Sequence, residues 1–139
     1  MNLFLFTVRE EFLALPGDEV VQVLPPGSVR EVHGSAGERF AEVDGCRLPV
    51  WGVPGGAQQE ERPASESTFL RIAVPGDGEA LVSVDLASGL MEVADGDVLP
   101  VPEYLFPPGQ AVYRGLFQEG GRNVGLLEAR QLGPRPRGA

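Results

Sequence analysis

The stretch from Thr68 to Asp85 constrains the fold most strongly, because its residues predict two strands joined by a tight turn. Residues 69–74 and 80–84 are rich in β-branched and aliphatic side chains, and Pro75-Gly76-Asp77-Gly78 lies between them. Glycine and aspartate tolerate positive φ, so this tetrapeptide lets the chain reverse at low strain. Alternation gives the hairpin one buried face, made of Leu70, Ile72, Val74, Ala80, Val82 and Val84. We expect this hairpin to open the second half of a two-part β protein.

Short apolar segments separated by turn residues occupy most of the remaining chain. Residues 3–8 are apolar on both faces, which predicts a strand buried on both sides. Asp44-Gly45 separates two such segments at 39–43 and 46–53, and an Asp-Gly pair favours a type I′ hairpin. Further strands are expected at 11–15, 20–24, 29–32, 90–93, 111–117 and 123–127. About ten short strands with turns roughly every 8–12 residues predict an all-β small barrel or sandwich.

The composition restricts the class of partner. The chain has 139 residues, enough for one domain, and a formal net charge of −9. An acidic surface repels phosphate backbones and anionic lipids, so we expect no nucleic-acid partner and no membrane insertion. No segment approaches the ~20 apolar residues of a membrane-spanning helix. The single cysteine fits a reducing compartment, and together these features favour a cytoplasmic protein.

Two segments lack the apolar residues that would offset the entropy cost of ordering them. Residues 54–67 carry no apolar side chain larger than alanine, which predicts a mobile linker. Residues 133–139, GPRPRGA, predict a disordered tail. The domain is therefore expected to extend over 1–132, with a first half at about 1–53 and a second half at about 68–132.

Residues that commonly carry catalysis or bind metals are sparse. Cys46 shares the apolar face of its strand with Leu48 and Val50, which predicts a buried, inert thiol. His33, expected in a polar loop, is the single histidine, so a structural zinc site from this chain alone is excluded. We expect no enzyme activity, no metal and no cofactor.

Four aromatic residues have two interpretations. Trp51, Tyr104, Phe106 and Tyr113 form either an exposed patch for a protein partner or ordinary parts of the core. Their positions in the sequence do not separate these alternatives.

Four motifs, in order along the chain, resemble the CheW-like domain of bacterial chemosensory systems. They are FLALP at 12–16 followed by 20–23, VDGCRLPV at 43–50, ALVSVD at 80–85, and YRGL at 113–116 with LLE at 126–128. The resemblance covers most of the chain, from about residue 3 to residue 132.

The resemblance implies two loose five-stranded β-barrels packed on each other, with no enzyme activity. It also implies an adaptor that bridges a CheA-type histidine kinase and the cytoplasmic tips of chemoreceptors through hydrophobic surfaces. By the match, the residues near these partner-binding surfaces are Val43, Asp44, Gly45, Val84 and Asp85.

The chain departs from the family pattern at one hairpin tip. Asp44 stands where the family has an arginine, which reverses the charge. The segment 25–43 is also shorter than in the family, and the stretch where many members carry a helix is the polar segment 54–67.

A hypothesis from another class is a small-ligand-binding or enzymatic double β-barrel with its site in the cleft between barrels. Convergent polar groups in that cleft would favour this second hypothesis, and exposed apolar surfaces would favour the adaptor.

Overall fold

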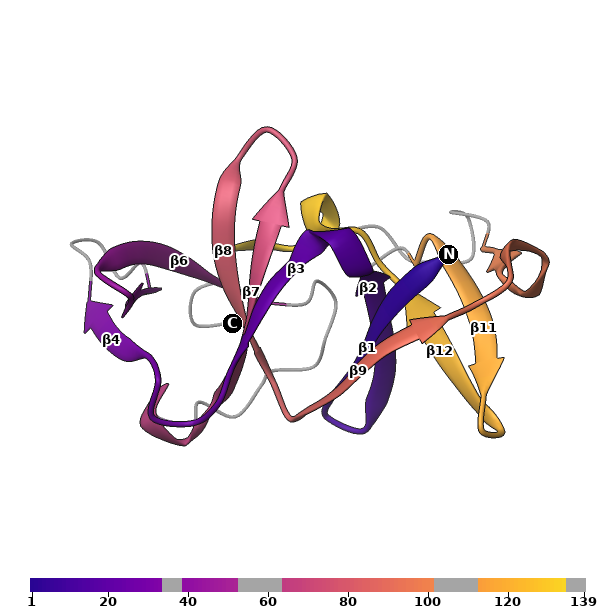
Figure 1. Ribbon diagram of the computed structural model, residues 1–139, viewed down its shortest axis with the longest axis horizontal. Coiled ribbons are helices and arrows are strands. Elements are labelled where there is room, and N and C mark those ends of the chain that lie inside the picture. The colour runs from indigo at the N-terminus through magenta and orange to yellow at the C-terminus, as the bar shows by residue number, and fades with distance from the viewer. Residues whose placement is uncertain (34–38, 53–63, 102–112, 135–139) are drawn as a thin grey trace.

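The computed structural model describes residues 1–33, 39–52, 64–101 and 113–134, in which β-strands predominate (Figure 1). The strands are β1 (Asn2–Val8), β2 (Glu11–Pro16), β3 (Val20–Leu24), β4 (Arg30–His33), β5 (Arg39–Val43), β6 (Cys46–Gly52), β7 (Thr68–Val74), β8 (Gly78–Val84), β9 (Leu86–Glu92), β10 (Leu99–Pro100), β11 (Gly115–Glu119), β12 (Arg122–Leu126) and β13 (Gly133–Pro134). Short 3-10 helices are η1 (Gly17–Glu19), η3 (Ala64–Glu66), η4 (Asp95–Asp97) and η6 (Ala129–Gln131). None of the helices described is long and apolar enough to cross a membrane. The all-β prediction is confirmed.

The described strands form two sheets. The first sheet has six strands in the order β10-β11-β12-β2-β1-β9. The second sheet has seven, in the order β3-β7-β8-β6-β5-β4 with β13 paired to β6. In Figure 1 the second sheet occupies the left and centre of the molecule, and the first sheet occupies the right. Both sheets remain open within the described residues, so the two expected barrels are found as two open, curled sheets.

The two sheets are built alike and exchange strands. Each contains one central hairpin, β1–β2 in the first sheet and β7–β8 in the second. β2 pairs in parallel with β12, and β8 pairs in the same way with β6. Each half of the chain therefore gives its hairpin to one sheet and its later strands to the other. The expected halves 1–53 and 68–132 are repeated units, but they are not separate barrels, because the chain crosses between sheets before β3 and before β9.

The two hairpins bury their apolar faces against each other. Leu70 pairs with Val82 and Ile72 pairs with Ala80, so the predicted face of the β7–β8 hairpin is confirmed. These residues pack with β1, β2 and the C-terminal segment in a central core. Its members are Phe4, Phe6, Val8, Leu13, Leu15, Leu70, Ile72, Val74, Ala80, Val82, Val84, Leu127, Ala129 and Leu132.

Each central hairpin also has a second buried face. In β1, Phe4 and Phe6 belong to the central core, whereas Leu3 belongs to an outer core of the first sheet with Phe117 and Val93. In the second sheet an equivalent outer core holds Leu24, Val29, Ala41, Val43, Val50, Phe69 and Leu81. The prediction that residues 3–8 are buried on both sides is therefore correct, because β1 lies between two cores.

Two segments differ from the sequence prediction. Residues 53–63 of the expected linker lie outside the described part of the chain, but 64–66 form η3 and Ser67 is buried, only 4% exposed. In the expected tail, Gly133 and Pro134 pair with β6 as β13, while 135–139 lie outside the described part. The backbone pairing of β13 with β6 fixes a short polar segment that hydrophobicity alone does not identify.

Two tight turns use left-handed backbone. Asp44 and Gly45 have φ of 49° and 79°, which confirms the predicted type I′ turn between β5 and β6. Arg9 and Glu10 have φ of 49° and 67°, so the β1–β2 turn adopts the same backbone without a glycine. Residues with a Cβ pay a steric cost in this region.

Candidate functional site

Asp44 and Gly45, two of the expected partner-binding residues, form the tip of the β5–β6 hairpin. Val43 pairs with Cys46 at the base of the turn and is only 2% exposed in the outer core of the second sheet. The side chain of Asp44 is 77% exposed. Asp44 can therefore present its charge to a partner, whereas Val43 anchors the hairpin.

Asp44 lies beside Arg71, whose shorter ion pair is with Glu79. Arg71 Nη2 lies 2.7 Å from Glu79 Oε1, and Arg71 Nη1 lies 3.9 Å from Asp44 Oδ2. Arg71 Nε also donates a 2.8 Å hydrogen bond to Glu79, and this bond raises the pKa of Arg71 above its ordinary value. Two carboxylates against one guanidinium leave the hairpin tip acidic.

Val84 and Asp85 lie at the end of β8, where the chain crosses to the first sheet. Val84 is 4% exposed in the central core. The Asp85 N–H donates a 2.8 Å hydrogen bond to the carbonyl of Thr7, and Asp85 Oδ2 accepts one from the N–H of Arg9. Asp85 therefore links the β8–β9 connection to the β1–β2 turn, a structural contact that the sequence motif did not reveal.

The five expected partner-binding residues do not form one site. Asp44 contacts Arg71, which pairs with Glu79 near the start of β8. Asp85 comes directly after the last residue of β8. A strand of this length spans roughly 20 Å at about 3.3 Å per residue. Val43 and Val84 are core residues, so Asp44, Gly45 and Asp85 are the members of the set that reach the surface.

Two expectations about catalytic residue types are wrong. Cys46 is exposed, because it is the first residue after the hairpin tip and β6 becomes buried only at Val50. His33 ends β4 opposite Arg39 and does not lie in a loop; its side chain is outside the described part. Among the described residues, no group of three or more His, Cys, Asp or Glu side chains is placed to hold a metal ion.

The two described aromatic candidates pack into the fold. Trp51 and Tyr113 are half-buried against the central core. Of the two interpretations, this placement favours ordinary parts of the core over an exposed patch. The hydroxyl of Tyr113 donates to Glu11 Oε2 at 3.4 Å, and burial raises the pKa of Tyr113. Tyr104 and Phe106 lie outside the described residues.

Exposed apolar residues on two edge strands were missed from the sequence. Strands β3 and β9 each lie at one edge of their sheet. Leu86 and Leu90 on β9 are 60% and 68% exposed, and Val21 and Val23 on β3 are 51% and 39% exposed. Burial alternates along residues 86–92, but both faces of LASGLME carry apolar residues, so hydrophobicity alone does not identify the exposed face of β9. We call these four residues the edge strip.

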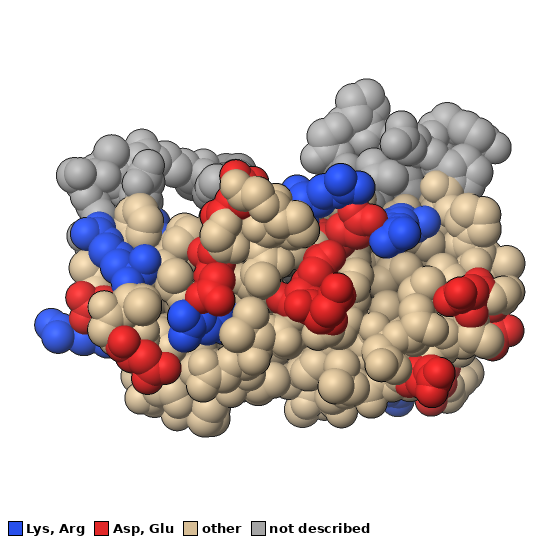
Figure 2. Space-filling model, turned by 45° about the horizontal axis from the view of Figure 1, so that its top comes forward, with Lys and Arg blue, Asp and Glu red and all other residues tan. Residues whose placement is uncertain are grey.

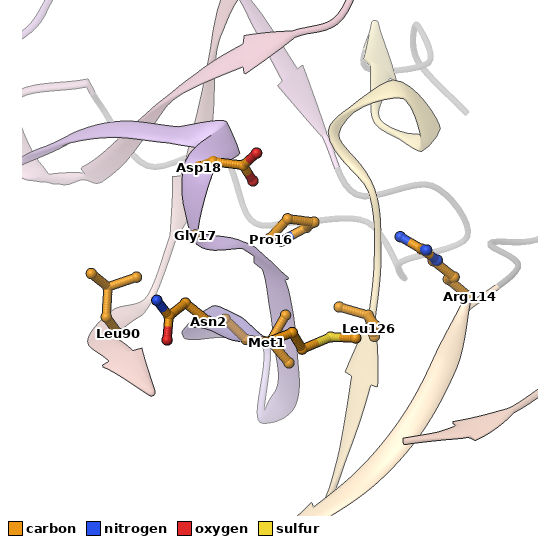
Figure 3. A pocket seen from close by; sticks show the side chains of 9 residues that line it. Met1, Asn2, Pro16, Gly17, Asp18, Leu90, Arg114 and Leu126 are labelled. Carbon is orange, nitrogen blue, oxygen red and sulfur yellow. The ribbon is translucent and has the colours of Figure 1, made fainter. Parts of the chain in front are cut away.

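An open pocket of about 410 Å³ lies beside the edge strip (Figure 3). Leu90 and Arg114 lie on opposite sides of it in this view, with Met1 and Asn2 between them. A Cβ placed on Gly17 would lie 2.8 Å from Leu90 Cδ2, so Leu90 rests directly on the start of η1. This contact connects β9 to the segment that leads into β3.

Charged residues are interspersed on the face shown in Figure 2. Several carboxylates there lie beside guanidinium groups, and the described part of this face has no continuous cationic area. Among the described residues, Glu128 pairs with Arg114 at 2.7 Å and with Arg130 at 2.6 Å. This distribution does not suit a phosphate backbone.

The central core lies between the two sheets. The described side chains of the central core are apolar and buried, and no buried side-chain nitrogen or oxygen among the described residues lacks a hydrogen-bond partner. Convergent polar groups, which the ligand-binding hypothesis requires between the barrels, are not found among these core residues.

Comparison with known proteins identifies the architecture. No family model and no curated protein matches the sequence. Matches to 15 chains of solved structures were found. One is the crystal structure of the scaffolding protein TtCheW from Thermoanaerobacter tengcongensis, with a TM-score of 0.68 and 15% sequence identity. The match covers 90% of this chain and 86% of that chain. The chain therefore has the CheW-like fold.

Proposed function

We propose that the protein is a non-catalytic, cytoplasmic adaptor of a bacterial chemosensory system, which bridges a CheA-type histidine kinase and chemoreceptors. The fold it shares with a scaffolding protein supports this role, as do the sequence motifs that resemble the CheW-like family. An adaptor needs surfaces that bind other proteins, not a site for chemistry.

The observation that carries the proposal is the edge strip. Large apolar side chains exposed on one face of an edge strand favour a protein interaction site. Leu86 and Leu90 project from β9, whose residues alternate between exposed and half-buried with none fully buried. Docking a partner there would remove this apolar area from water at roughly 25 cal/mol per Å².

The proposal is tested by titrating the purified protein against the kinase regulatory domain and a receptor cytoplasmic fragment from the same genome. Binding by calorimetry is the expected result for at least one of the two. Leu86→Ser and Leu90→Ser together should weaken that binding about tenfold or more, because buried apolar anchors dominate interface energies.

Leu86→Met and Leu90→Met together are the matched control. They change the same two exposed positions of β9 but keep large apolar side chains there. This control variant should leave binding to the kinase and receptor nearly unchanged. Absence of binding to both partners would exclude the adaptor role, and equal losses in both variants would exclude the edge strip as the interface.

A further inference from the structure

The two sheets differ at one equivalent position. In the second sheet, β4 pairs with four consecutive residues of β5, from Arg39 to Glu42. In the first sheet, β10 holds the corresponding place beside β11 but pairs only with Gly115 and Leu116. Among the described residues, Phe117 and Gln118 therefore have no strand partner on that side. In the second sheet, Arg30 and Glu31 of β4 occupy the equivalent places.

A pocket of about 540 Å³ occupies this open position. It is lined by both edges of the curled first sheet, with Met91 and Glu92 of β9 on one side and β11 on the other. Its inner wall includes Val93 and Phe117, which are 6% and 3% exposed and belong to the outer core. The pocket is thus an apolar recess beside an unpaired strand edge.

The rim of the pocket is anionic. Glu92, Asp97 and Glu119 line it and are exposed, and the described residues that line it include no arginine. No ion pair joins these three carboxylates to another described residue. Three exposed carboxylates around a recess with an apolar inner wall favour an occupant that carries positive charge beside apolar side chains.

We propose that this pocket is a docking site for an extended arginine- or lysine-bearing segment of a partner protein, which adds to β11 as a strand. Successive residues of β11 direct their backbone groups to opposite sides, so one of Phe117 and Gln118 supplies the N–H and C=O for pairing, as in other cases of strand addition to an open edge. Alternate apolar side chains of the segment enter the recess, and its basic side chains meet the three carboxylates. The site is separate from the edge strip, and the proposal does not depend on the adaptor role.

The probe is a short fluorescein-labelled peptide that alternates leucine and arginine, measured by fluorescence anisotropy. A peptide alternating leucine and glutamate is its charge-reversed match. The basic peptide should bind at least about tenfold more tightly than the acidic one, and added salt should weaken it. Failure of the basic peptide to bind overturns the proposal.

Two protein variants separate this pocket from the general acidity of the chain. Glu92→Gln, Asp97→Asn and Glu119→Gln together should weaken binding of the basic peptide about tenfold or more. The control removes the same number of exposed carboxylates elsewhere, in Glu10→Gln, Glu42→Gln and Asp77→Asn. This control variant should retain much more of the wild-type affinity for the basic peptide than the pocket variant does. Equal losses would mean that the peptide senses only the net charge, and the pocket would be excluded.

N-methylated peptides test the strand pairing itself. Successive residues of a strand direct their N–H groups to opposite sides, so only one alternate set can pair with β11. One peptide is methylated on the leucine nitrogens and the other on the arginine nitrogens. We expect one of the two to lose about tenfold or more in affinity and the other to retain it. Equal affinities would overturn strand addition.

Discussion

Asp85 Oδ2 lies 2.6 Å from the backbone nitrogen of Arg9, a residue 76 positions away in the sequence. Arg9 and Glu10 both adopt positive φ in the β1–β2 turn, which is costly for residues with a Cβ. The carboxylate satisfies a backbone donor of this turn and stabilises it. It does so at the point where β8 leaves the second sheet and continues as β9 of the first.

Asp85→Ala should therefore lower the free energy of unfolding by about 0.5–1.5 kcal/mol, because solvent screens this exposed hydrogen bond to a charged group. Urea denaturation measures this loss. Asp77→Ala, an exposed turn position between β7 and β8, is the control and should change stability by less than about 0.5 kcal/mol. Equal stability of the two variants would show that the Arg9 contact contributes nothing.

The central core provides a second prediction. Val84→Ala removes apolar volume from a side chain that is 4% exposed, so it should cost about 1–3 kcal/mol through lost burial and a residual cavity. Val21→Ala, at a position 51% exposed, should cost far less. Thermal unfolding followed by circular dichroism compares them. Unchanged melting of the Val84 variant would contradict the placement of this residue between the sheets.

Local patterns predicted the hairpins well, because the residues that decide them are adjacent. Alternation placed Leu70, Ile72 and Val82 correctly, and Asp44-Gly45 identified its turn. The exchange of strands between sheets was not predictable in this way. It depends on parallel pairs such as Leu13 with Gly125, which join distant segments.

The candidate site was less predictable than the fold. Alternation implied that Cys46 is buried, but a strand that leaves a hairpin tip begins in solvent. Asp85 was identified through a motif, whereas its partner Arg9 is visible only once the two sheets are packed. The edge strip and the unpaired edge at Phe117 depend on where each sheet ends, which composition does not encode.

Glu19 gives the stability a defined pH dependence. Its Oε2 accepts a 2.8 Å hydrogen bond from the N–H of Ala129, which joins η1 to η6. Burial raises the pKa of Glu19 above its ordinary value of 4.5, more than this hydrogen bond lowers it. The folded protein then binds the proton more tightly than the unfolded chain, so this contribution to stability is present below pH 4.5 and is lost as pH rises through the folded pKa.

Glu19→Gln removes this titration. The stability of the wild-type protein relative to the variant should therefore decrease as pH rises from below 4.5 through the raised pKa. Urea unfolding at a series of pH values provides the comparison. A relative stability that stays constant or increases across this range would contradict a raised pKa of Glu19 in the folded protein.

Asp44 provides the last prediction, which concerns partner choice. The side chain is 77% exposed and only 3.9 Å from Arg71, whose stronger contact is Glu79. Charge at an exposed rim mainly sets the association rate and penalises partners of like charge. A CheA-type kinase whose own adaptor carries arginine at this tip should therefore bind this protein weakly. Asp44→Arg should strengthen that binding and weaken binding to the kinase proposed above as this protein's own partner.

Asp44→Asn is the matched control, because asparagine tolerates the positive φ of the turn and removes the charge without reversing it. Its affinities should fall between those of the wild-type protein and Asp44→Arg for both kinases. Titrations at two salt concentrations should bring the three proteins closer together at high salt, since screening weakens exposed charges. If all three bind both kinases equally at low salt, the β5–β6 tip lies outside the interface, and the reversed charge at Asp44 has no part in selecting the partner.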